Sequence, residues 1–92
     1  MTRRHHFHLD HAGHSVSVTV QTGHGAAVVV LVDGKETGYV KLSGDRPVTV
    51  AVELPTDPPS QAVVRVTPGP DAPHCVLEAP GAEPQVMPPR AY

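Results

Sequence analysis

The chain has 92 residues, a formal net charge of −2 with neutral histidines, and a single cysteine. This length is enough for one small domain, and one cysteine excludes an intrachain disulfide, so stability must come from burial of apolar side chains. Aromatic residues make up only 3% of the chain, and its basic residues form no stripe. A nucleic-acid partner is therefore not expected, because such binders need stacking rings and clustered cations.

The first predicted strand covers residues 5–10, where histidines alternate with apolar residues. Successive side chains of a strand point to opposite faces, so this strand would direct Phe7 and Leu9 inward. Its other face would carry imidazoles, and a His-x-His pair on a strand can supply two ligands to Zn²⁺ or a similar metal. The candidate metal site consists of His6, His8, Asp10, His11 and His14.

Two other interpretations of these histidines stay open. They can form a solvated polar face that holds no cofactor, or a segment whose charge responds to pH, because imidazoles titrate near neutrality. The sequence alone does not decide among the three.

The run from His6 to His11 also resembles the His-x-His-x-Asp-His motif of the metallo-β-lactamase superfamily. In that family the first two histidines hold one metal, which implies His6 and His8 here, while Asp10 and His11 would serve a second. The resemblance covers six residues of the chain. It implies an αββα fold and hydrolytic activity, whereas a motif counts only in its structural context. A hydrolytic metalloenzyme is therefore the third functional hypothesis.

Valines at alternate positions predict further strands. Residues 15–21 alternate valine with hydroxyl and amide side chains, which is typical of a half-buried strand. Residues 26–32 are apolar throughout, so they predict a strand covered on both faces or paired with another subunit. Asp33-Gly34 follows and favours a two-residue type I′ turn, because both residues tolerate positive φ. The return strand, residues 35–42, would place Val40 and Leu42 inward.

The second half of the chain predicts three more strands, at residues 48–54, 61–67 and 74–79, the last with Cys75 and Leu77 inward. No segment has helical periodicity. About seven short strands predict an all-β fold, a small antiparallel β-sandwich of immunoglobulin-like type, with a small β-barrel as the alternative. Residues 1–79 would form this single domain. Residues 80–92 are rich in proline, so we expect a flexible C-terminal tail that cannot extend a sheet.

The functional expectation is a non-enzymatic interaction or accessory domain. It would bind another protein, or a second copy of itself as a homodimer, through an edge strand or its loops. The alternative is a metal-binding protein that uses the histidine cluster. No apolar run is long enough to cross a bilayer and no secretory signal is evident, so we expect a cytoplasmic protein without a membrane partner.

Overall fold

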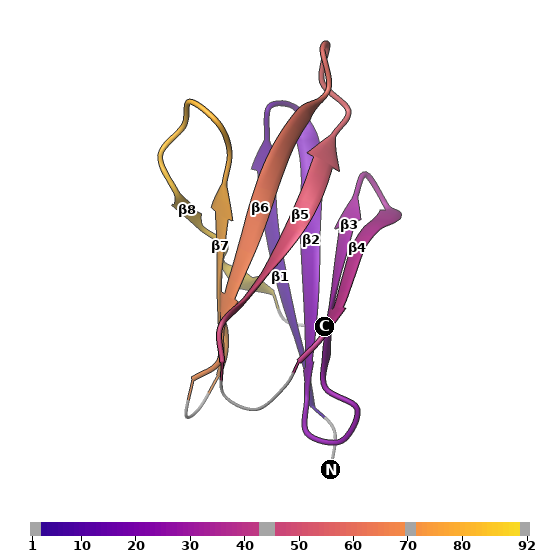
Figure 1. Ribbon diagram of the computed structural model, residues 1–92, viewed down its shortest axis with the longest axis vertical. Coiled ribbons are helices and arrows are strands. Elements are labelled where there is room, and N and C mark those ends of the chain that lie inside the picture. The colour runs from indigo at the N-terminus through magenta and orange to yellow at the C-terminus, as the bar shows by residue number, and fades with distance from the viewer. Residues whose placement is uncertain (1–2, 43–45, 70–71, 91–92) are drawn as a thin grey trace.

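The computed structural model describes residues 3–42, 46–69 and 72–90 and shows two antiparallel sheets packed face to face (Figure 1). The first sheet has the strand order β4-β3-β2-β1-β9. Its strands are β1 (Arg3–His11), β2 (His14–Thr22), β3 (Ala27–Val32), β4 (Lys35–Lys41) and β9 (Pro89–Arg90). The second sheet has the order β5-β6-β7-β8. Its strands are β5 (Val48–Leu54), β6 (Ser60–Thr67), β7 (His74–Glu78) and β8 (Gln85–Val86).

The all-β class and the small antiparallel sandwich are thus confirmed. Seven of the nine strands match the predicted ones in order and approximate position. The immunoglobulin-like connectivity is not confirmed, because that fold distributes its strands between sheets by Greek-key connections. Here β1 to β4 run consecutively through one sheet, and β5 to β8 through the other. The αββα fold implied by the six-residue resemblance is not observed, since the described residues contain no helix.

Two tight turns set the register of the first sheet. Asp33 and Gly34 have φ of 52° and 84°, as the Asp-Gly pair predicts for a type I′ turn. The turn between β1 and β2 has the same signs, with φ of 51° at Ala12 and 79° at Gly13. Because the turn between β1 and β2 uses two residues, these strands pair without a slip and alternate side chains keep to one face. The pairing of β3 with β4 starts in the same way at Val32 and Lys35 and shifts by one residue between Leu31 and Val30.

The core lies between the sheets and consists mostly of valine. Phe7, Cys75 and Leu77 are buried in it as predicted, and Val40, Leu42 and Leu9 pack against it. Burying one such aliphatic side chain contributes about 1.5–3 kcal/mol relative to leaving it exposed. Strand β3 lies between β2 and β4, but these neighbours pair with its backbone and do not cover its outer face, so the expected cover on both faces is not observed. Its inward residues Val28 and Val30 are fully buried, while its outer face is only half-covered.

One side of the sandwich is closed by residues 85–90, which cross from the second sheet to the first. Strand β8 pairs with β7, and β9 pairs with β1. Between them Met87 is 1% exposed, its N–H donating to the Cys75 carbonyl over 2.9 Å. The expectation that this proline-rich segment cannot extend a sheet differs from the structure. Two-residue strands at a sheet edge need few donors, so the surrounding prolines are compatible with them.

The opposite side carries the two seven-residue edge strands, β4 and β5, which are not paired with each other. They approach closely at one point, where a Cβ added to Gly38 would lie 2.5 Å from Val50 Cγ1. The start of β4 and the end of β5 lie toward the upper end of the molecule in the view of Figure 1. We call this the open side, and the side sealed by residues 85–90 the closed side.

As for membranes, no helix with the length and apolar character of a bilayer-spanning segment occurs in the described part of the chain.

Candidate functional site

His6 and His8 of β1 stand on the outer face of the first sheet, beside hydroxyl groups from β2. The strand register places His6 opposite Thr19 and His8 opposite Ser17. His6 Nδ1 lies 3.2 Å from Thr19 Oγ1, and His8 Nδ1 lies 3.1 Å from Ser17 Oγ. The alternating pattern of β2 therefore serves both faces of the sheet. Its valines are buried in the core, and its outward hydroxyls on Thr19 and Ser17 hydrogen-bond to His6 and His8.

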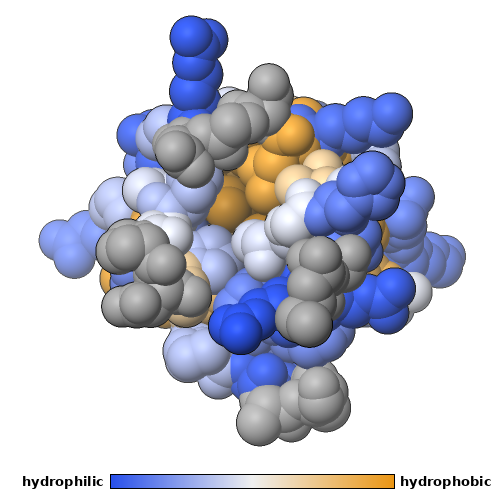
Figure 2. Space-filling model, turned by 90° about the horizontal axis from the view of Figure 1, so that it is seen from below, coloured by the Kyte–Doolittle hydropathy of each residue, from blue (hydrophilic) through white to orange (hydrophobic). Residues whose placement is uncertain are grey.

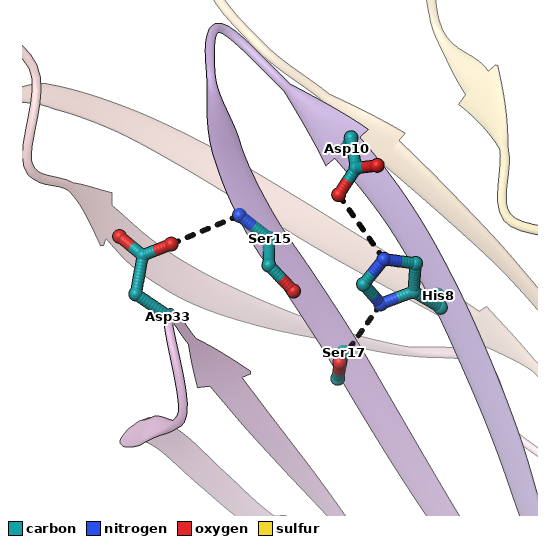
Figure 3. A network of polar contacts seen from close by, with 5 residues as sticks. All are labelled: His8, Asp10, Ser15, Ser17 and Asp33. Atoms are coloured by element: carbon teal, nitrogen blue, oxygen red, sulfur yellow. Dashed lines mark hydrogen bonds and ion pairs between the residues drawn. The ribbon is translucent and has the colours of Figure 1, made fainter.

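His8 has a second partner on its own strand. Its Nε2 lies 3.1 Å from Asp10 Oδ1, so the ring bridges Ser17 and Asp10 (Figure 3). The predicted same-face arrangement of His8 and Asp10 is confirmed by this contact. With Asp10 79% exposed, the pair is a solvated surface interaction, which contributes little to stability.

His14 and His11 contact partners from other parts of the chain. His14 Nδ1 lies 2.7 Å from Asp33 Oδ2, and the other oxygen of Asp33 accepts the Ser15 N–H over 3.0 Å. His11 Nδ1 lies 3.3 Å from Gln85 Oε1 near the closed side. The Ser15 N–H, followed by the hydrogen bond from His14, lowers the pKa of the Asp33 carboxyl. This carboxylate joins the turn between β3 and β4 to the start of β2.

The five predicted metal ligands thus divide among three places rather than meeting at one. No group of three or more histidine, cysteine or acidic side chains could hold a metal ion among the residues described. Any Zn²⁺ site made of His6, His8, Asp10, His11 and His14 would require these side chains to leave their present partners. The metal assignment stays a prediction, which calorimetric titration of untagged protein with Zn²⁺ can test against a peptide of residues 1–14.

Cys75 lies in the core and not beside a base. Its side chain is fully buried, and this burial raises the pKa of the thiol to about 12. A thiol with such a pKa is not ionised at neutral pH, and the thiolate is the reactive form. The interpretation of Cys75 as a buried cysteine is confirmed by its burial.

A groove on the open side was not predicted from the sequence. It has a volume of about 370 Å³ and lies where β4 begins and β5 ends. Its lining residues are His14, Val32, Asp33, Lys35, Thr37, Glu53 and Pro55. These residues come from three separate segments of the chain, so no local spacing indicates the groove. The nearest sequence signal is Asp33-Gly34, which correctly predicts the hairpin that forms one wall.

Comparison with known proteins adds no functional guide: no protein family, curated protein or solved structure matches this chain.

Proposed function

We propose that the chain is a non-enzymatic interaction domain that accepts an extended segment of a partner protein, or of a second copy, at the open side. The observation that carries this proposal is the position of its two long unpaired strand edges on one side of the sandwich, with the groove between them. An edge strand exposes a row of unpaired N–H and C=O groups, to which an added strand can hydrogen-bond.

The four strand edges differ in how well they are protected. Strands β8 and β9 have two residues each, and β9 begins with a proline. Short edges and prolines are the usual means of preventing unwanted strand pairing. Strand β4 carries charged residues and a register shift between Val30 and Leu31 in its pairing with β3. Strand β5 alternates regularly from Val48 to Leu54 and has Glu53 as its single charged residue, which makes it the least protected edge.

The groove limits where a partner could lie. The close approach of Gly38 to Val50 leaves no space between β4 and β5 at that level, so a partner segment would occupy the upper part. There Pro55 provides exposed apolar surface and Val32 is 3% exposed, while Lys35 and Glu53 supply opposite charges from β4 and β5. A short extended segment with an apolar side chain directed into the groove fits this surface, since backbone pairing gives affinity and the pocket gives specificity.

A pair of tryptophan variants tests the proposal. Thr37 lines the groove, whereas Thr49 is equally exposed on β5 but is not a lining residue. Peptides selected from a random displayed library on the folded domain should bind Thr37→Trp about tenfold more weakly, a loss of about 1.4 kcal/mol, and Thr49→Trp unchanged. Sedimentation velocity over a range of concentrations tests self-association with the same variants. A strictly monomeric protein that also enriches no peptide, or peptides indifferent to Thr37→Trp, would overturn the proposal.

We further propose a cytoplasmic location, supported by the single buried thiol of Cys75, since a chain with one buried cysteine gains nothing from an oxidising compartment.

A further inference from the structure

The lower end of the sandwich contains an apolar hollow that is separate from the open-side groove. Seen from below, apolar surface gathers inside a ring of polar residues (Figure 2). The hollow has a volume of about 270 Å³. Its lining residues are Arg3, His5, Val20, Thr22, Leu42, Val66, Pro68, Gly69, Ala72 and Pro73.

The hollow follows from the composition of the core. Val20 and Val66, one from each sheet, are fully buried at its floor. Phe7 is the one phenylalanine of the chain, and tryptophan is absent, so valines meet here without a large ring to fill the end of the core. Pro68 and Pro73 form part of the rim, where their fixed φ angles limit inward collapse of the chain. The accessible apolar surface of the hollow comes from partly exposed lining residues such as Leu42 and Pro68.

The described lining of the hollow includes one cation, Arg3 of β1. An adjoining hollow shares Thr22 and Leu42 and adds the cation Lys41. Cations beside apolar surface complement a ligand that carries one negative group on an apolar chain.

We propose that this hollow binds a small aliphatic monocarboxylate, with the carboxylate beside Arg3 and the hydrocarbon chain against Leu42 and Pro68, over the floor formed by Val20 and Val66. The volume is slightly below the range of about 300–1,000 Å³ that is typical of pockets for drug-sized ligands, so a short chain fits better than a long fatty acid. This site is independent of the open-side groove, because the two share no lining residue.

Octanoate is the probe, titrated into the full chain while methyl resonances are followed by NMR. The methyl signals of Val20, Leu42 and Val66 should shift saturably. Octylammonium, which has the same chain and the opposite charge, should bind at least about fivefold more weakly, because it loses the ion pair with Arg3. Equal binding of both probes, or shifts spread over the outer faces of the sheets, would overturn the proposal.

Substitutions in and outside the hollow test whether octanoate binds there. Thr22→Trp should fill the hollow and abolish the octanoate shifts, while Thr49→Trp, an equally large change at an exposed position of β5, should leave them unchanged. Arg3→Gln should weaken binding by up to about fivefold, since exposed ion pairs contribute at most about 1 kcal/mol. Retention of full affinity in both Thr22→Trp and Arg3→Gln would show that octanoate binds elsewhere and would contradict the assignment.

Discussion

The closed and open sides of this sandwich differ in how their strand edges are covered. On each side both sheets end in an edge strand whose backbone groups have no further strand to pair with. On the closed side, residues 85–90 pair with one sheet and then the other, and Met87 fills the space between them. On the open side, β4 and β5 touch at Gly38 and Val50 without pairing. A proline-rich segment can thus seal an edge that regular strands leave accessible.

The largest effect should come from removing the side chain that fills the closed side. Met87→Ala should lower the free energy of unfolding by about 3 kcal/mol, because truncating a buried methionine removes apolar contacts and leaves a cavity. Urea denaturation measures this change. Val86→Ala is the matched control, since Val86 is the adjacent residue and is 72% exposed; its effect should stay within about 0.5 kcal/mol. Equal effects of the two substitutions would mean that the closed side is not sealed by Met87.

A smaller loss is expected at the contact point of the open side. Gly38→Ala should cost about 2 kcal/mol, because the new Cβ would overlap Val50 Cγ1 and force β4 and β5 apart. Gly38 is not among the residues with positive φ, so the alanine backbone fits and the contact alone is tested. Thr37→Ala, at the exposed neighbouring position, is the control for denaturation experiments. An unchanged stability of Gly38→Ala would show that the two strands do not approach this closely.

Raising the pH should lower the free energy of unfolding, because the Cys75 thiol is buried in the folded state. Burial raises the pKa of Cys75 to about 12 in the folded chain, from an ordinary thiol value of 9.0. The folded state therefore keeps a proton that the unfolded state loses, so stability is intact below pH 9 and falls by about 1.4 kcal/mol per pH unit above it. Cys75→Ala should lack this part of the pH dependence, so the stability difference between the two proteins should narrow or reverse between pH 9 and 11. Parallel pH profiles would place the thiol in contact with water.

The smallest change is expected at Asp33. Its lowered pKa means that the carboxylate stabilises the fold above its unfolded pKa, and that this contribution disappears as the pH falls through the folded value. Asp33→Asn keeps a residue that tolerates the positive φ of the turn but removes the charge. Thermal unfolding should show a slightly less stable variant at pH 7 and no difference near pH 2. A deficit that persists at pH 2 would indicate damage to the turn rather than loss of the charge.

Local sequence patterns were sufficient to predict most of the strands and one of the tight turns. The alternation of valines gave the strands and their buried faces, and Asp33-Gly34 gave its turn, because both depend on neighbours within a few residues. The same alternation correctly placed His6 and His8 on the face opposite Phe7.

Features that depend on distant residues were not predictable in this way. The burial of Met87 depends on β7 and β1 lying on either side of a segment whose own sequence indicates coil. The contacts of His14 with Asp33 and of His11 with Gln85 join segments far apart in the chain, whereas strand alternation alone places His11 on the face opposite His8. Both grooves are lined by segments far apart in the chain, so no spacing along the sequence indicates them.

Residue-resolved hydrogen exchange tests the contrast between the two sides most directly. The Met87 N–H donates to the Cys75 carbonyl, and the His8 N–H donates to the Pro88 carbonyl over 3.2 Å. Both amides should exchange slowly, with protection close to that of the central strand β6, if residues 85–90 are an integral part of the sandwich. Exchange of the Met87 amide at the rate of an unstructured peptide, while β6 remains protected, would contradict the account.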